Sequence, residues 1–294
     1  MYVITGATGN TGHVLATRLL EAGQKVRVVG RSRERLQQFA ARNAEVAVAD
    51  LRDESAVVTA FSDANAVFAM IPPSMTSSNY RAEQDQTSDV IAKAIEKTGV
   101  PNVLSLSSVG ADKPDGTGPV AGLHYLEERL NQIADLNVLH LRPAYFMENT
   151  LTQVMPIRMM GATAGPLHSD LRIPMIATRD IGVAAADLLL KLNFRGKQTK
   201  ELHGERDLSY NDVTSIIGKA IGQPGLVYKE LSSAEFRAAL EQMGVSANVA
   251  GLIAELGEAL NSGHIKMLEP RSPSTSTATS YEAFVADVFV PAFG

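Results

Sequence analysis

The sequence contains no cysteine and no tryptophan, and aromatic residues make up only 5% of its 294 residues. Without cysteine, the chain can form no disulfide, no thiolate nucleophile, no iron–sulfur cluster and no cysteine-ligated zinc site. Its histidines are scattered, with no pair four residues apart that encloses a carboxylate, so the sequence gives no support for a metal site. They are His13, His124, His140, His168, His203 and His264.

Long hydrophobic runs are also missing. No apolar run reaches about 18 residues, the length at which a membrane-spanning helix is expected. Met1 is followed directly by a strand-like segment, Tyr2–Thr5, without the basic start and apolar core of a secretory signal. We therefore expect a cytoplasmic location and no membrane partner.

Basic residues are fewer than acidic ones, and the formal net charge is −5. This balance argues against a nucleic-acid partner, because phosphate binding along a nucleic acid needs a concentrated basic face. The exception is one short basic run, which consists of Arg27, Arg31, Arg33 and Arg35.

The first half of the chain alternates short apolar runs with longer segments of helical period, as parallel strands and crossover helices do. The runs are mostly uninterrupted, as expected for strands covered on both faces. Asp53 is a good N-cap for the third helix. We predict strands at Tyr2–Thr5, Lys25–Gly30, Ala44–Ala49, Ala66–Ile71, Asn102–Ser107 and Asn137–Arg142, and helices near residues 11–22, 32–42, 53–61, 79–98 and 122–135.

After Pro143 the rhythm changes, and prolines, glycines and three methionines (Met155, Met159, Met160) indicate irregular, adaptable structure. Helical period returns later, with short strand-like pieces between, and a polar stretch at 271–280 is expected to be a loop or mobile tail before a last helix. We expect a doubly wound parallel sheet in residues 1–150 and a smaller C-terminal α/β portion in 151–294, whose segments can interleave with the sheet. The later helices are expected at Arg179–Leu192, Tyr210–Ile221, Ser233–Met243, Ala247–Ser262 and Tyr281–Val290, and the strand-like pieces at Glu201–His203 and Val227–Glu230.

A glycine-rich turn follows the first strand and opens the first helix. Its spacing is G-x-x-G-x-x-G, with Gly6, Gly9 and Gly12. A phosphate-binding turn needs glycine where the backbone turns tightly, where it approaches a pyrophosphate and where helix meets sheet, and the helix N-terminus then supplies N–H donors. The sequence therefore predicts a Rossmann-type dinucleotide site. Its residues include Gly6, Thr8, Gly9, Asn10, Thr11 and Gly12.

The end of the second strand favours NADP(H) over NAD(H). Arg31 follows this strand, where a carboxylate would bind the ribose of NAD and a guanidinium would hold a 2′-phosphate. The alternative is that Arg31, Arg33 and Arg35 form a solvated helix start. Asp50, after the third strand, either lies beside the adenine or caps the following turn.

Several segments in order resemble the NmrA-like branch of the atypical short-chain dehydrogenases/reductases. They are the opening GATGNTG, Ile71–Pro73, Ser107–Ser108, Leu141–Asn149, Ala177–Ile181 and Leu208–Val213. The resemblance spans nearly the whole chain. It implies a Rossmann domain, a small substrate domain and an NADP(H) preference.

The tyrosine–lysine pair of short-chain dehydrogenases is missing from the expected place. Tyr125 is followed by Arg129 at the right interval, but an arginine does not replace a titratable lysine. The family's lysine position falls on His124, and Val120 then stands where the proton-donating tyrosine would be. The resemblance implies quinone or azo-dye reductases with such a histidine, which would hold the nicotinamide ribose; the alternative is a surface histidine.

The remaining candidates lie at the carboxyl ends of strands, where doubly wound sheets bind ligands. For cofactor binding these are Ile71, Pro72, Ser107 and Pro143, together with Arg31, Asp50 and His124. Tyr145, Phe146 and Asn149 are the substrate candidates, although the two aromatic rings could equally fill the core. His124 and Tyr145 are the catalytic candidates.

Two functions remain open from the sequence. The first is an NADPH-dependent oxidoreductase acting on a planar conjugated small molecule such as a quinone or azo compound, with the methionine-rich segment contributing to an apolar pocket. The second is a redox sensor that binds NADP(H) without turnover and regulates a protein partner. A monomer and a homodimer are both compatible with the sequence.

Overall fold

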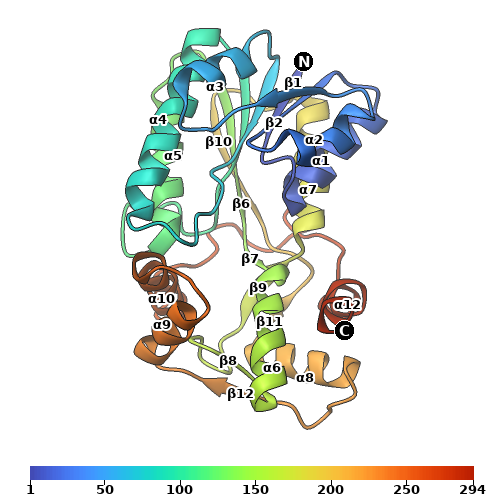
Figure 1. Ribbon diagram of the computed structural model, residues 1–294, viewed down its shortest axis with the longest axis vertical. Helices are drawn as coiled ribbons and strands as arrows, with labels where there is room; N and C mark the ends of the chain where they lie inside the picture. The colour runs from blue at the N-terminus through green and yellow to red at the C-terminus, as the bar shows by residue number, and fades with distance from the viewer.

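Figure 1 shows the computed structural model of residues 1–294, in which a sheet with helices on both faces forms one half of the molecule and a more irregular portion forms the other. The sheet has seven strands, all parallel, in the order β10-β6-β5-β4-β1-β2-β3. The strand order reverses between β1 and β4, so the predicted doubly wound α/β fold is confirmed. The strands are β1 (Tyr2–Thr5), β2 (Val26–Gly30), β3 (Glu45–Val48), β4 (Ala66–Ala69), β5 (Asn102–Leu106), β6 (Asn137–Pro143) and β10 (Lys197–Leu202).

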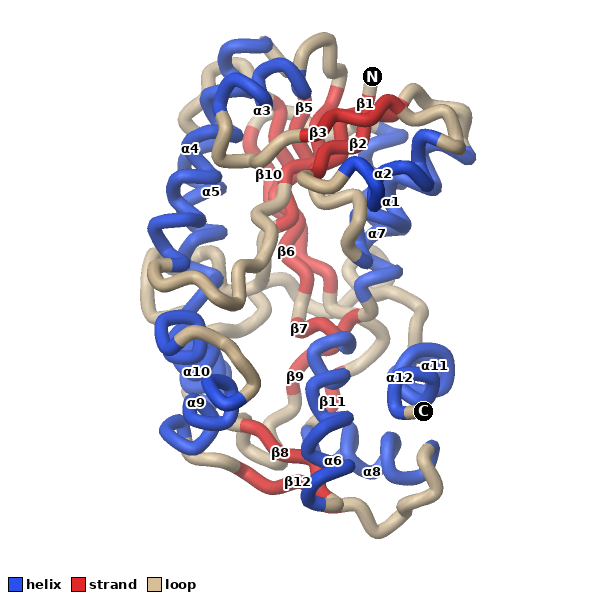
Figure 2. The backbone as a smooth tube through the Cα atoms, in the orientation of Figure 1, coloured by secondary structure: helices blue, strands red, loops and turns tan.

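Three helices cover each face of this sheet (Figure 2). One face packs against α1 (Asn10–Glu21), α2 (Arg33–Ala40) and α7 (Thr178–Lys191), and the other against α3 (Glu54–Phe61), α4 (Tyr80–Thr98) and α5 (Ala121–Asn131), which follows the short 3-10 helix η1 (Gly118–Val120). Each face buries its own apolar cluster, which explains why the strands read as uninterrupted apolar runs.

The helices begin where the sequence supplies capping side chains. Ser32, Asp53 and Asn79 each accept a hydrogen bond from a backbone N–H in the first turn of α2, α3 and α4. The predicted cap at Asp53 is therefore confirmed. Helix α4 ends at Gly99, whose φ of +66° is the left-handed conformation that glycine adopts without steric cost.

The seventh strand is a correction to the predicted six. The strand expected near Glu201–His203, in the C-terminal part of the chain, interleaves with the main sheet: β10 pairs with β6 at its edge, from Lys197 beside Val138 to Leu202 beside Pro143. Its first three residues are exposed and polar, because an edge strand has no neighbour on one side. No apolar run therefore marked it. The helix predicted at 179–192 likewise packs on α1.

The smaller portion lies below the carboxyl edge of the sheet (Figure 1). It contains a three-stranded sheet, β11-β9-β7, a two-stranded sheet, β12-β8, and the helices around them. The expected boundary near residue 150 stays a prediction. The elements are β7 (Tyr145–Phe146), η2 (Met147–Gln153), α6 (Val154–Met160), β8 (Ala162–Gly165), β9 (Ile173–Ile176), β11 (Asp207–Leu208), α8 (Tyr210–Ala220), β12 (Val227–Glu230), α9 (Ser233–Gln242), α10 (Ala247–Asn261), α11 (Tyr281–Phe284), the π-helical η3 (Val285–Phe289) and α12 (Val290–Phe293).

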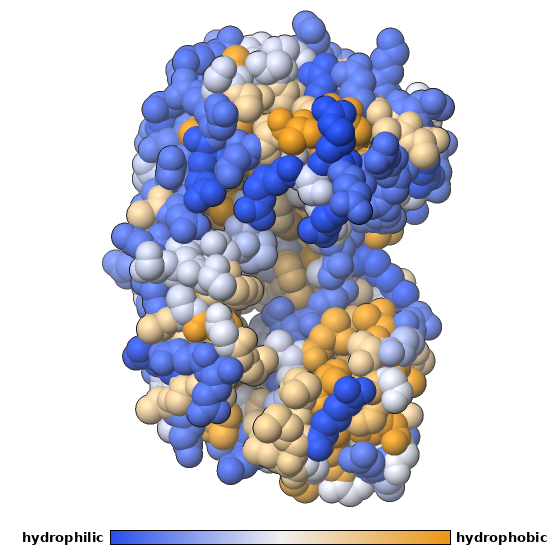
Figure 3. All heavy atoms as spheres, viewed as in Figure 1, coloured by the Kyte–Doolittle hydropathy of each residue, from blue (hydrophilic) through white to orange (hydrophobic).

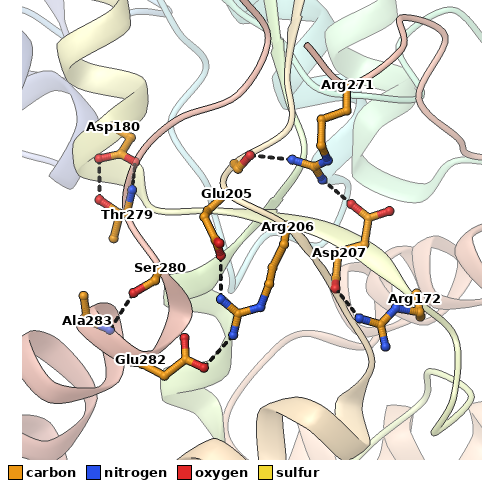
Figure 4. A network of polar contacts seen from close by, with 11 residues as sticks. Arg172, Asp180, Glu205, Arg206, Asp207, Arg271, Thr279, Ser280, Glu282 and Ala283 are labelled. Carbon is orange, nitrogen blue, oxygen red and sulfur yellow. Dashed lines mark hydrogen bonds and ion pairs between the residues drawn. The ribbon is translucent and has the colours of Figure 1, made fainter. Parts of the chain in front are cut away.

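The polar stretch 271–280 is a loop held at both ends by hydrogen bonds (Figure 4). At one end Arg271 donates to the carbonyl oxygen of Gly204 and pairs with Asp207. At the other end the backbone N–H and the hydroxyl of Thr279 both donate to the carboxylate of Asp180, at 3.0 and 2.6 Å. The loop thereby leads the chain from α10 past the sheet to α11.

Strand β6 carries a fully buried histidine between two polar partners. The Nδ1 of His140 lies 2.7 Å from the hydroxyl of Ser105, and its Nε2 lies 2.9 Å from the amide oxygen of Asn131. Burial lowers the pKa of His140 to about 4; nearby Glu127 opposes this shift and Arg142 adds to it. The imidazole is therefore neutral at neutral pH.

This buried imidazole predicts a stability that falls in mild acid. Because the folded pKa lies below the unfolded one, the unfolded chain takes up a proton first, and stability falls as the pH drops from about 6.5 towards about 4. The loss attributable to His140 is up to about 3 kcal/mol. Urea unfolding measured across this range should show a shallower pH dependence in His140→Gln than in the wild type, whereas exposed His13→Gln should match the wild type. Equal slopes in all three proteins would contradict the prediction.

Candidate functional site

The glycine turn joins β1 to α1 with very little room between them. Gly6 has a φ of +66°. A β-carbon on Gly12 would lie 2.3 Å from the carbonyl oxygen of Gly6, which no side chain can tolerate, whereas one on Gly9 would meet that oxygen at 3.4 Å, an ordinary contact. Only glycine at position 12 therefore lets α1 start against the turn, and its first N–H groups stay free of intrahelical acceptors.

A polar groove of about 510 Å³ runs from this turn along the carboxyl ends of β1, β2, β3 and β4. It passes the point where the strand order reverses, the usual ligand site of a doubly wound sheet. Among the residues predicted for cofactor binding, those that line the groove are Gly6, Thr8, Arg31, Asp50, Ile71 and Pro72.

Other predicted cofactor residues do not line the groove. Gly9 and Asn10 begin helix α1 and are exposed. The hydroxyl of Thr11 donates to the carbonyl oxygen of Thr178 at 3.4 Å, so this side chain ties α1 to α7. Pro143 is buried at the end of β6, where its carbonyl oxygen accepts from the N–H of Val109.

Three arginines face one end of the groove. Two of them, Arg31 and Arg35, come from the segment after β2. Arg33, which belongs to the same segment, does not line the groove. Arg35 donates to the carbonyl oxygen of Thr8 at 3.2 Å. The third is Arg52, which sequence reasoning missed because it lies in the turn after β3, far from the basic run.

Asp50 caps its own turn and pairs with Arg52. Its Oδ1 accepts from the backbone N–H of Arg52 at 2.9 Å, and the guanidinium contacts both carboxylate oxygens, at 3.2 and 3.1 Å. This hydrogen bonding with the side chain of Arg52 lowers the pKa of Asp50, and it outweighs the opposing effect of burial. Asp50 is therefore a compensated anion at the wall of the groove.

Next to the groove lies a second cavity of about 390 Å³ that is mainly apolar, since 16 of its 23 lining residues are hydrophobic. Both cavities share the segment from Met70 to Met75, apart from Pro72, and the side chains of Tyr80 and Gln84. Figure 3 shows the surface hollowed between the sheet portion and the smaller portion. Of the predicted residues, Ile71, Ser107, Val120, Tyr145, Phe146 and Asn149 line this cavity.

One wall of the apolar cavity comes from helix α10, through residues that the sequence did not single out. They are Val249, Ile253, Leu256 and Leu260. The methionine-rich segment expected to contribute to the pocket is a correction: Met155, Met159 and Met160 are exposed on α6 and do not line the cavity. The methionines that do line it are Met70 and Met75.

A buried ion pair lies behind Ser107. The hydroxyl of Ser107 donates to Oε1 of Glu127 at 2.5 Å. Arg142 holds the same carboxylate through two hydrogen bonds, at 2.9 and 2.5 Å. All three residues are at least nine-tenths buried, so the charges compensate each other away from water.

Tyr145 lies over the apolar cavity with its hydroxyl 3.0 Å from that of Tyr210. Burial raises the pKa of the Tyr145 hydroxyl, and hydrogen bonds with Tyr210 and Asn149 offset part of that rise. The phenol therefore stays protonated at neutral pH and is a weak acid.

His124 and Tyr125, the two residues considered at the position of the tyrosine–lysine pair, make contacts outside both cavities. The Nδ1 of His124 donates to the carbonyl oxygen of Ala111 at 2.9 Å, and His124 lines neither cavity. The hydroxyl of Tyr125 donates to Asp89 at 3.2 Å, beside the Arg129–Asp89 ion pair between α4 and α5. Neither side chain contacts the cavities.

Two findings bear on what could bind besides a dinucleotide. No group of three histidine, aspartate or glutamate side chains is arranged to hold a metal ion. None of the helices combines the length and the hydropathy needed to cross a membrane.

The comparisons with known proteins agree with this architecture. The model of the NmrA-like family matches residues 2–284. The chain is 27% identical over 240 residues to (4-alkanoyl-5-oxo-2,5-dihydrofuran-3-yl)methyl phosphate reductase of Streptomyces griseus, covering 82% of this chain and 80% of the relative. It is 28% identical over 260 residues to quinone oxidoreductase 2 of Escherichia coli, covering 87% and 86%.

Among solved structures, the fold is similar to that of the NADPH-dependent quinone oxidoreductase QOR2 of Escherichia coli complexed with NADPH. The TM-score is 0.83 at 23% identity, and the match covers 98% of this chain and 100% of the other. At this identity the likeness concerns the fold.

The different clearances at the glycine turn predict two distinguishable variants. Gly9→Val should fold with a nearly unchanged melting temperature but lose most of its dinucleotide affinity, because the side chain occupies the space above the helix N-terminus. Gly12→Val should lose thermal stability, because its β-carbon collides with the Gly6 carbonyl. Thermal unfolding and fluorescence titration with NADPH measure both effects. Unchanged NADPH affinity in Gly9→Val would remove the groove as the dinucleotide site.

Proposed function

The chain belongs to the NmrA-like family, and we propose that it is an NADPH-dependent oxidoreductase that reduces a planar conjugated acceptor such as a quinone or an azo compound. The observation that carries this proposal is that the two cavities adjoin: a polar groove at the glycine turn and an apolar pocket share seven lining residues. A dinucleotide in the groove would thus have its reactive end beside an apolar acceptor site.

The residues of the groove fit NADPH. Because Gly12 has no side chain, α1 can begin directly against the turn, and the start of α1 offers free N–H donors to a pyrophosphate. Arg31 and Arg35 supply guanidinium groups for a 2′-phosphate, while Arg52 compensates the charge of Asp50, which would otherwise repel that phosphate. When bound, NADPH supplies the hydride.

The apolar pocket suits acceptors that need little help with protonation. Val120 lies in its wall, the Tyr125 hydroxyl is engaged by Asp89, and the Tyr145 phenol is a weak acid. Charge on a quinone or azo compound delocalises over the conjugated system, so water can complete the reduction, whereas a simple ketone requires a positioned acid. Both relatives compared above are named as reductases or oxidoreductases, which supports the same class of reaction.

Two predicted site residues have proposed roles in this pocket. Tyr145, with Phe146 and Asn149, would contact the acceptor, and its bond with Tyr210 holds the ring in place. His124 would act through the segment that follows β5, because it anchors the carbonyl of Ala111 close to Ser107 and Ser108 in the chain. Direct contact of His124 with a nicotinamide ribose stays a prediction.

Cofactor preference tests the arginine end of the groove. Arg31→Asp should weaken NADPH binding roughly 30-fold, because a charge-assisted contact becomes repulsive, and should leave NADH affinity much less affected. Arg33→Asp, which makes the same charge change at an exposed site outside the groove, is the matched control and should bind NADPH like the wild type. Wild-type protein that binds NADH as tightly as NADPH would contradict the assignment.

Acceptor choice tests turnover itself. NADPH oxidation, followed by absorbance, should proceed with a naphthoquinone and not with cyclohexanone. Leu256→Trp fills the apolar pocket from α10 without reaching the groove, so it should lower quinone turnover at least roughly tenfold while NADPH affinity is retained. Tight NADPH binding without oxidation by any quinone or azo compound would favour the sensor function instead, and rapid ketone reduction would mean that a proton donor has been missed.

A further inference from the structure

Gln84 lies where the groove and the apolar pocket meet. It belongs to helix α4, lines both cavities and is only 2% exposed. A glutamine this deeply buried normally has partners for both ends of its amide.

Only one end of this amide has a partner. The Nε2 of Gln84 donates to the carbonyl oxygen of Pro119 at 2.9 Å, which defines which end of the amide is the nitrogen. The Oε1 of Gln84 is buried and accepts no hydrogen bond. A buried acceptor without a donor costs on the order of 1–3 kcal/mol, so the chain carries an unused acceptor at this point.

Packing prevents the amide from turning away. A β-carbon on Gly122 would lie 2.3 Å from both Cδ and Oε1 of Gln84, so the start of α5 presses directly on the amide. With Pro119 on its nitrogen and Gly122 against its carbonyl, the group is held in one orientation before any ligand arrives.

A second polar side chain of the pocket, Ser107, also offers only an acceptor to a ligand. The Ser107 hydroxyl donates its hydrogen bond to Glu127, and the ion pair with Arg142 holds that carboxylate in place. Only the lone pairs of the Ser107 oxygen remain for a ligand. Two buried groups on the pocket side therefore accept hydrogen bonds, so this place suits an N–H donor rather than a carbonyl oxygen.

We propose that Gln84 is a cofactor-binding residue whose Oε1 accepts a hydrogen bond from the carboxamide N–H of NADPH. The inference rests on the proposed function, since it is the nicotinamide end of the cofactor that would lie where the groove and the apolar pocket adjoin. The carboxamide is the N–H donor at that end. Gln84 thereby selects the ring orientation in which the carboxamide nitrogen faces α4.

Binding of a cofactor analogue tests this contact without relying on turnover. In the reduced 3-acetylpyridine analogue of NADPH, a methyl group replaces the carboxamide NH₂, so the N–H donor is lost. The wild type should bind NADPH roughly tenfold more tightly than this analogue, as measured by calorimetry. In Gln84→Met, which keeps the length of the side chain and removes the acceptor, the two ligands should bind within roughly twofold of each other.

The matched control is Ser88→Ala, one helical turn further along α4. Its hydroxyl is fully buried and donates to the backbone carbonyl of Gln84, but Ser88 lines neither cavity. The variant should keep the wild-type preference for NADPH. If Gln84 only braced Pro119, Gln84→Met would lower the melting temperature and weaken both ligands equally.

Each outcome separates this inference from the proposed function. Equal affinity of the wild type for both ligands, or an unchanged preference in Gln84→Met, overturns the role of Gln84 while NADPH binding stands. Failure of the wild type to bind either ligand overturns the proposed function itself. Equal affinity of the wild type for the two ligands overturns the role of Gln84 even if Gln84→Met does not fold.

Discussion

The backbone of helix α1 approaches the glycine turn so closely that a β-carbon on Gly12 would lie 2.3 Å from the Gly6 carbonyl oxygen. This approach sets where α1 begins, and its free N–H groups consequently point over the carboxyl edge of the sheet. The turn also packs closely on Met70, the residue after β4, because a β-carbon on Gly6 would lie 2.5 Å from the side chain of Met70. Met70 in turn lines both cavities, so the turn and the apolar cavity share a wall.

That shared wall is connected to the smaller portion of the chain. The loop between β4 and α4 is bound to the start of α10 by hydrogen bonds from the N–H of Ser246 to Met75, from the hydroxyl of Ser246 to Ser77, and from the N–H of Tyr80 to the side chain of Asn248. Helix α10 supplies an apolar wall of the pocket. The loop that lines the groove and the helix that walls the apolar pocket are therefore fixed to each other.

Polar groups near the pocket are used almost entirely by the protein itself. Asp50 forms an ion pair with Arg52, and Glu127 forms one with Arg142. The Tyr145 hydroxyl is hydrogen-bonded to that of Tyr210. Such pairing leaves few groups able to give a proton to a bound acceptor and leaves the Oε1 of Gln84 as a buried acceptor without a donor. A site of this kind binds and orients a cofactor and its acceptor more than it performs acid–base chemistry.

Much of the sheet portion was predictable from the sequence, because its signals are local. The apolar runs located the first six strands within one or two residues, Asp53 marked a helix start, and the glycine spacing located the turn. Position in the chain sufficed for Arg31, since the residue after β2 must lie at the carboxyl edge of a parallel sheet.

The tertiary structure decided the rest, because contacts between distant segments leave no local pattern. Strand β10 lacks an apolar run, since it lies at the sheet edge, and Arg52 enters the groove from a turn outside the basic run. The methionines of α6 are exposed. The pocket wall comes instead from α10, which begins more than 90 residues after Met155. In the sequence Gln84 is an ordinary helix residue; only the packing of Pro119 and Gly122 around it shows that its amide is fixed with an unpaired acceptor.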